Sequence, residues 1–281
     1  MDKKISFLVA VLFVAIIAFS GCVSKPKEQT LTSSAAFIGG TQGLAISLLP
    51  GQPPTQLFED QNFTINVQVE NKGEGTLIQD VVNAKPNVYG YVALSGIDST
   101  RFSLSPGLSD VISKALTPAK KIGTSVAPGG QTSVSFKAKA PLIEGASADF
   151  PLTISAIYAY TSKSVASVCL QENVYQQTTA GPEICKVSGT KTVSAQSAPV
   201  KVSSVTEQPS GENEVSFTIK IKNFGKGIPF DMSKTFPQSE SQIGYELANY
   251  VKVESVKIGD TPATCDSLAT NKMLFLVNGE G

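Results

Sequence analysis

Two stretches of the chain, far apart in sequence, share one pattern. Residues 63–75 read FTINVQVENKGEG, and residues 215–227 read VSFTIKIKNFGKG. In each stretch every second residue is Val, Ile or Phe and the residues between are polar, which is typical of a β-strand with one buried face. Each stretch then ends in Asn-x-Gly-x-Gly, a turn sequence whose residue types tolerate positive φ angles. The sequence therefore predicts two strands that end in the same turn.

The two stretches also match in register. Asn71, Gly73 and Gly75 align with Asn223, Gly225 and Gly227, and the four apolar residues of each strand align with one another. The two stretches are offset by 152 residues, the difference between Asn71 and Asn223. An offset of this length is much longer than the repeat of a solenoid or a propeller and suits whole domains in tandem. The alternative is a chance match between two amphipathic strands that end in a common turn.

Composition limits the classes of function. The chain has 281 residues, of which 41% are hydrophobic and 16% are charged, and its formal net charge is zero. This is typical of a globular chain of about two domains. A neutral chain without a Lys/Arg run offers no electrostatic reason to bind nucleic acid. We expect no nucleic-acid partner.

The N-terminus has the pattern of an export signal. Lys3 and Lys4 precede an apolar stretch, residues 5–19, that only Ser6 interrupts, and small residues follow it. Residues 19–22, Phe-Ser-Gly-Cys, resemble a lipobox, the site at which prokaryotic lipoproteins are cleaved before a lipid-modified Cys; Phe19 stands where Leu is usual. The resemblance implies a signal peptide over residues 1–22 and a lipid on Cys22. An uncleaved anchor helix and plain secretion remain as alternatives, and all three place the mature chain outside the cytoplasm.

The other cysteines fit that location. Cys169 and Cys185 are 16 residues apart and flank an expected hairpin, so we expect them to form a disulfide, which is typical of extracytoplasmic proteins. A metal site is not expected, because the spacing is not that of a zinc site and the chain contains no His. Cys265 is left as a free thiol or as one whose partner is missing.

The rest of the chain divides by its pattern. Residues 23–38 read as a polar tether, residues 39–196 as a first β-sandwich domain and residues 197–281 as a second one. Strands are expected over 43–50, 87–96, 131–141 and 198–205, a hairpin over 150–170, and amphipathic segments over 246–259 and 273–281. Residues 105–130 are interpreted as a long insertion with room for a short helix. Because Asn278-Gly279 is a strong hairpin signal without a return strand, the second domain is expected to be truncated at the C-terminus.

These features predict an all-β chain of two tandem immunoglobulin-like antiparallel β-sandwich domains after an N-terminal signal or anchor. At the repeated phrase the chain resembles the immunoglobulin-like domains called CARDB, which are adhesion-related modules of bacterial and archaeal surface proteins. Residues 37–54 also look like the start of archaeal surface proteins in which such domains follow a lipobox or signal. The resemblance implies an architecture and no particular activity.

Candidate functional residues are few. A chain without His cannot form a Ser-His-Asp triad or a Cys-His pair, so we expect no enzyme and no cofactor. Clustered carboxylates at loop ends could chelate calcium, and weak candidates for this are Glu59, Asp60, Glu74 and Asp80. Aromatic rings could stack on a carbohydrate or another ligand, or could belong to the core; the candidates are Tyr89, Tyr91, Tyr158 and Tyr160. Asn62-Phe63-Thr64 is a possible N-glycosylation acceptor.

The expected function follows from these features. The leading hypothesis is a structural or adhesive protein, anchored at the extracellular face of the membrane by its lipid or by an N-terminal helix. Its partner would be a protein or a glycan at the cell surface. The alternatives are a carbohydrate-binding or other ligand-binding surface lipoprotein, and an accessory region of a larger surface enzyme.

Overall fold

The computed structural model describes residues 37–171, 185–211 and 214–281, except residues 267 and 269. The described residues belong to one compact unit. The described residues are built from antiparallel strands, and one short 3₁₀ turn over Glu240–Gln242 is their only helical element. The predicted all-β class is confirmed.

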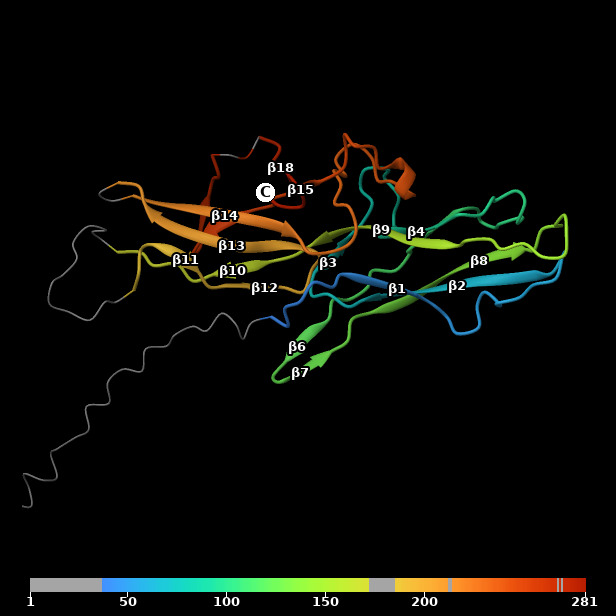
Figure 1. Ribbon diagram of the computed structural model, residues 1–281. Coiled ribbons are helices and arrows are strands. Elements are labelled where there is room, and N and C mark those ends of the chain that lie inside the picture. The colour runs from blue at the N-terminus through green and yellow to red at the C-terminus, as the bar shows by residue number, and fades with distance from the viewer. Residues whose placement is uncertain (1–36, 172–184, 212–213, 267, 269) are drawn as a thin grey trace, which may run out of the picture. The chain divides into compact units, whose positions relative to one another are not determined.

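The first half of the chain forms two facing sheets (Figure 1). One sheet has the order β1-β2-β8, with β1 over Leu44–Leu48, β2 over Asn62–Asn71 and β8 over Gln131–Lys139. The other has the order β3-β9-β4-β5, with β3 over Thr76–Ile78, β9 over Thr153–Thr161, β4 over Gly90–Ser95 and β5 over Ser109–Val111. Apolar side chains of both sheets form one buried cluster, which makes this half a two-layer sandwich.

The core follows from the alternation in the sequence. Ile65, Val67 and Val69 of β2 are almost fully buried, and they meet Val134 and Phe136 of β8 in the same cluster. The polar residues between them face outward, so β2 buries one face only, as its sequence predicts. Burial of these side chains stabilises the sandwich by roughly 1.5–3 kcal/mol for each.

The four-stranded sheet is covered on its outer face as well. Tyr91 and Ala93 of β4 and Ile157 and Ala159 of β9 form a second cluster with Phe236, and residues near Phe236 pack against it. The rings of Tyr91 and Phe236 meet edge to face, with 5.7 Å between their centroids. Strand β4 is therefore buried on both faces, which explains why its sequence, GYVALS, hardly alternates.

The second half repeats the local geometry of the first. Strand β13 (Val200–Pro209) pairs with β14 (Val215–Asn223), and β11 (Gly189–Lys191) pairs with the other edge of β13. The register at the strand end is the same in both copies, because Leu44 lies opposite Asn71 and Val200 lies opposite Asn223. The apolar face of β14 is only partly buried, whereas that of β2 is sealed.

The repeated turn is held by the same hydrogen bonds in both copies. The Nδ2 of Asn71 donates to the carbonyl of Gly75 at 3.2 Å, and its Oδ1 accepts the amide of Gly73 at 3.2 Å. The Nδ2 of Asn223 donates to the carbonyl of Gly227 at 2.8 Å, and its Oδ1 accepts the amide of Gly225 at 3.0 Å. This equivalence favours a structural repeat over a chance match.

The reason for glycine in this turn differs from the expected one. None of the Asn or Gly residues of the two turns has a positive φ angle. A Cβ at Gly73 would lie 2.2 Å from the hydroxyl oxygen of Tyr160, and one at Gly75 would lie 2.3 Å from the carbonyl oxygen of Thr161. In the first copy glycine is therefore required by close packing and not by backbone conformation.

The Asn278-Gly279 turn is confirmed. Both residues have positive φ angles, and Val277 and Glu280 exchange backbone hydrogen bonds across the turn at 2.9 and 3.1 Å. The residues after the turn lie against β14, with Glu280 opposite Lys222. In the first copy Gln131 of β8 lies opposite Glu70 in the equivalent position.

The remaining strands form short antiparallel pairs. Strand β6 (Lys120–Ile122) pairs with β7 (Ser125–Ala127), and β10 (Ser164–Ala166) pairs with β12 (Val193–Ala195). Strand β15 (Tyr250–Lys252) pairs with β18 (Met273–Phe275), and β16 (Val256–Ile258) pairs with β17 (Thr261–Ala263).

Two local expectations were wrong. Residues 105–130 contain β5 and the β6–β7 hairpin and no helix. The expected hairpin over 150–170 does not form, because β9 pairs with β3 and β4 and the strand after the turn, β10, pairs with β12. The division into domains at residue 196 stays a prediction; β11, which precedes it, pairs with β13, which follows it.

We predict that the two copies of the turn differ in their contribution to stability. Asn71→Ala removes hydrogen bonds of a fully buried amide, so we expect a loss of about 1–3 kcal/mol in the free energy of unfolding. Asn223→Ala acts on a partly exposed amide and should cost less. Urea denaturation of the two variants measures the difference. Equal losses would contradict the buried role of Asn71.

Candidate functional site

The calcium candidates lie at separate places. The Oε1 of Glu59 accepts the amide of Ile143 at 2.8 Å, and Asp60 forms an ion pair of 2.9 Å with Lys139. Asp80 is buried and its carboxylate accepts the backbone and side-chain amides of Asn83 and the hydroxyl of Tyr91. No group of three His, Cys, Asp or Glu side chains converges among the described residues. The four candidates therefore do not share a site.

Glu74, the fourth candidate, instead joins three parts of the chain. Its side chain is largely buried, its Oε1 accepts the amide of Ile38 at 2.8 Å, and its Oε2 accepts the amides of Gly39 and Ser197 at 3.0 and 2.8 Å. The amide of Glu74 itself donates to the carbonyl of Ser197 at 2.9 Å. A carboxylate with three backbone donors is occupied as an acceptor. Glu74 thus ties the start of the described chain and the segment before β13 to the repeated turn.

Of the four tyrosines, three use their hydroxyl groups inside the protein. Tyr158 accepts the amide of Leu44 at 3.4 Å, and Tyr160 accepts the amide of Gly75 at 2.9 Å while it donates to Asn71 Oδ1 at 3.0 Å. Tyr91 is buried on the opposite face of the sheet, and Tyr89 packs against the first core cluster. These hydrogen bonds and core contacts favour the alternative that the tyrosines belong to the core, and their role in ligand binding stays a prediction.

The environment of two tyrosines also changes their ionisation. Burial raises the pKa of Tyr160 well above its usual value, and the hydrogen bond from Gly75 opposes this only in part. Burial raises the pKa of Tyr158 as well. Their rings meet edge to face with 5.8 Å between centroids, so the two side chains form one partly buried arrangement near the end of β9.

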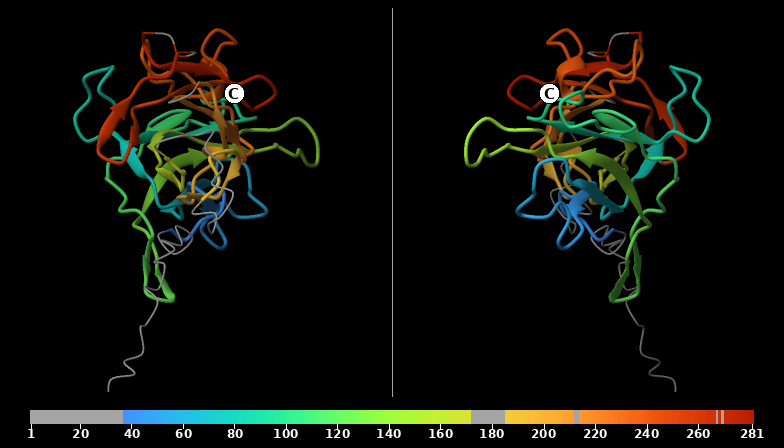
Figure 2. Two further views of the ribbon diagram at one scale, coloured as in Figure 1. Left: turned by 90° about the vertical axis from the view of Figure 1, so that its left-hand side faces the viewer. Right: turned by 90° about the vertical axis from the view of Figure 1, so that its right-hand side faces the viewer.

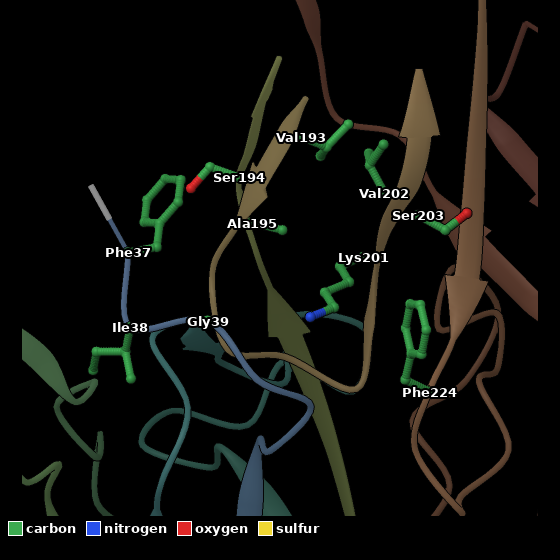
Figure 3. Close-up of a pocket in the computed structure, with 10 residues that line it drawn as sticks. All are labelled: Phe37, Ile38, Gly39, Val193, Ser194, Ala195, Lys201, Val202, Ser203 and Phe224. Atoms are coloured by element: carbon green, nitrogen blue, oxygen red, sulfur yellow. The ribbon is translucent and has the colours of Figure 1, made fainter. Parts of the chain in front are cut away.

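An open hollow of about 390 Å³ lies between the start of the described chain and the second half (Figure 3). Its lining is mostly apolar and comes from residues 37–39, β12, β13 and the turn after β14. The Nζ of Lys201 lies 5.2 Å from the centroid of the Phe224 ring and donates to the carbonyl of Gly40. This amine is the only charged group among the described residues that line the hollow, and it already has a partner, so we interpret the hollow as a contact surface.

The predicted disulfide between Cys169 and Cys185 is confirmed, with 5.8 Å between the Cα atoms. A buried ion pair that the sequence did not indicate lies beside it. The Oε2 of Glu207, a fully buried residue of β13, lies 2.6 Å from the Nζ of Lys191 and accepts the amide of Cys169 at 3.1 Å. The disulfide loop is therefore joined to the β11–β13 pair by a charge-assisted hydrogen bond.

The other modification candidates are placed as follows. Asn62 begins β2 and its side chain is exposed, which leaves the acceptor nitrogen accessible. Cys265 is free and partly buried. Cys22 lies outside the described residues.

Comparison with known proteins did not identify a relative of this chain. No protein-family model matches the sequence, and no curated protein and no solved structure matches it significantly. None of the residues that the structure describes forms a helix with the length and hydrophobicity needed to cross a bilayer.

We predict that stability falls at alkaline pH. The pKa of Tyr160 is higher in the folded chain than in the unfolded chain, where Tyr titrates near pH 10. The neutral phenol is therefore favoured by folding: its contribution is complete below about pH 10 and is lost as the pH rises toward the folded pKa. Denaturation at a series of pH values measures the fall.

Variants of two tyrosines test the cause. Tyr160→Phe leaves the Gly75 amide and Asn71 Oδ1 without this partner, so we expect a loss of about 1–3 kcal/mol at neutral pH and a shallower fall above pH 10. Tyr245→Phe is the control, because that ring is 92% exposed. An unchanged pH profile in Tyr160→Phe would assign the alkaline loss to other groups.

We predict that the disulfide stabilises the fold through the loop that it closes. Replacing both Cys169 and Cys185 by Ser removes a cross-link across 16 residues, which should cost roughly 3 kcal/mol. Urea denaturation with and without a reductant measures this loss. Cys265→Ser keeps the disulfide and should respond to the reductant as the native protein does. If the double variant is as stable as the native chain, the loop is held by other contacts.

Proposed function

We propose that the chain is a membrane-anchored extracellular protein whose immunoglobulin-like sandwich modules serve as structural or adhesive elements. The observation that carries the proposal is the repeated turn, in which Asn71 and Asn223 make equivalent hydrogen bonds at the ends of equivalent strand pairs. A chain that repeats one module is suited to holding an ectodomain at a distance from the membrane or to presenting a surface to a partner. Such a function depends on exposed surface and not on a reacting residue.

The location is part of the proposal. The signal-like N-terminus ends in Cys22, which would carry the lipid, and the disulfide between Cys169 and Cys185 is typical of an oxidising compartment. We place the mature chain at the extracellular face of the membrane, held by its lipid or by an N-terminal helix. Its partners would be proteins or glycans of the cell surface.

The residues that remain exposed support a binding role more than a catalytic one. Phe224 is partly exposed between Lys201 and Lys222, whose amines lie 5.2 and 5.8 Å from its ring centroid. An aromatic ring flanked by two amines suits contact with a polar surface such as a glycan or another protein. This patch is a second place, in addition to the tyrosines, where the ligand-binding alternative would be tested.

We predict that Cys22 decides how the protein is held. The native chain, expressed with its signal in a prokaryotic host, should partition into the detergent phase and yield an N-terminal peptide with the mass of a lipid-modified Cys. Cys22→Ser should lose the lipid and either enter the aqueous phase or remain attached by an uncleaved signal. Proteolysis of whole cells, and thiol labelling of Cys169 after denaturation, test the side of the membrane.

The control is Cys265→Ser, which leaves the lipobox-like residues intact and should partition as the native chain does. A native chain that stays in the cytosol, is protected from external protease and has Cys169 open to alkylation would refute the proposed location.

A further inference from the structure

We propose that the β6–β7 hairpin is a second membrane contact, which lays Ile122, Val126 and two lysines on an anionic lipid surface. The inference rests on the proposed anchoring of the chain and adds to it a surface that holds the folded unit against the bilayer.

The hairpin exposes apolar side chains that no other part of the described chain covers. Ile122 is 64% exposed and Val126 is 54% exposed. Gly123, with a φ angle of 61°, and Thr124 form the tip, where Ile122 pairs with Ser125. In Figures 1 and 2 the hairpin stands away from the sheets. A two-stranded hairpin is marginally stable by itself in water, so a surface that covers the tip would add to its stability.

The two apolar residues lie on opposite faces of the hairpin. Ile122 lies opposite Ser125, whereas Val126 lies opposite Lys121, one position further along the ladder. Because neighbouring positions of a strand point to opposite faces, a flat protein partner could cover only one of the two side chains. A hairpin that enters the interfacial layer of a bilayer with its tip would bury both.

The charge of this region matches anionic headgroups. Residues 111–130, which contain the hairpin, include three lysines and no acidic residue, in a chain whose formal net charge is zero. Lys120 and Lys121 lie on the hairpin, both are exposed, and neither forms an ion pair with a described residue. Each lysine near an anionic membrane surface contributes about 1 kcal/mol to binding.

The hairpin also begins next to the point at which the tether meets the folded unit. Val126, Pro128 and Gly129 line a hollow together with Ile38 and Gly39, and Glu74 fixes Ile38 and Gly39 through their amides. Residues 23–36, which precede this point, span at most about 50 Å when fully extended. An anchor at Cys22 would therefore keep the hairpin at a high local concentration near the bilayer.

The chain contains no Trp, so a single Trp at the tip is a clean reporter. The test uses the full-length Ile122→Trp chain, reconstituted by its own anchor into vesicles of zwitterionic and anionic lipids with brominated acyl chains. We expect blue-shifted emission that the bromines quench, because the indole would lie about 5–10 Å below the headgroups. Vesicles of zwitterionic lipid alone should give weaker quenching.

A matched control places the reporter far from the hairpin. Leu142 is 66% exposed and follows the opposite end of β8, a strand of about 30 Å. Leu142→Trp should show neither the shift nor the quenching. Adding Lys120→Gln and Lys121→Gln to Ile122→Trp should lower the ratio of bound to free hairpin by about fivefold for each lysine. Equal melting temperatures of the variants show that the fold is kept.

The outcomes separate the two proposals. If the chain is in the vesicles but the Trp at position 122 is quenched no more than the one at position 142, the hairpin contact is wrong and the anchor stands. If the native chain does not associate with vesicles at all, the proposed anchoring fails, and the hairpin contact fails with it. A blue shift that grows with protein concentration in the absence of lipid would assign the tip to a contact between copies and would overturn the membrane contact.

Discussion

The hydrogen-bonded turn at Asn71 is the interaction on which the rest of the structure depends. Its side chain closes the turn to Gly73 and Gly75, accepts the hydroxyl of Tyr160 from the facing sheet, and donates to the carbonyl of Leu116. The turn also carries Glu74, which binds the amides of residues 38, 39 and 197. One five-residue turn thus connects both sheets of the sandwich with the start of the described chain and with the second half.

The second copy keeps the turn and lacks these additional contacts. Asn223 makes both local hydrogen bonds, but it lies partly exposed, and a Cβ at Gly227 would meet no neighbouring atom. The two copies therefore share the hydrogen bonds within the turn and differ in the side chains that pack around it. The turn of the first copy joins distant segments of the chain. In the second copy Phe224 stays exposed beside Lys201 and Lys222.

The sequence was a good guide where a strand buries one face. Strands β2, β8 and β14 alternate clearly, and their positions follow directly from that pattern. It was a poor guide to pairing, since β9 joins strands that precede it by about 60 residues or more and does not pair with its neighbour β10. Strands β5, β6 and β7 have three residues each, which is too few for a period to be recognised.

For residues of the candidate site, too, the sequence did not indicate which distant segments contact them. Glu74 and Glu207 look like solvated charges in the sequence, and both are buried because distant segments cover them and bring donors to them. Tyr158 and Tyr160 are two residues apart in β9, which places both on one face of the strand, but nothing in the sequence indicates their partners, Leu44, Asn71 and Gly75. The exposed hairpin tip has no signal of its own beyond two lysines beside an isoleucine.

The long-range pairing of β2 sets an order for folding. Asn62 at one end of β2 lies opposite Lys139, so the β1-β2-β8 sheet is complete only after the segment between them has been synthesised. The amide that Ser197 donates to Glu74 closes a still longer loop, across 123 residues. Contacts of such separation form slowly, because the entropy of closing the loop must be overcome first. The hydrogen bond between Ser197 and Glu74, and with it the tie between the repeated turn and the segment before β13, therefore forms late in folding.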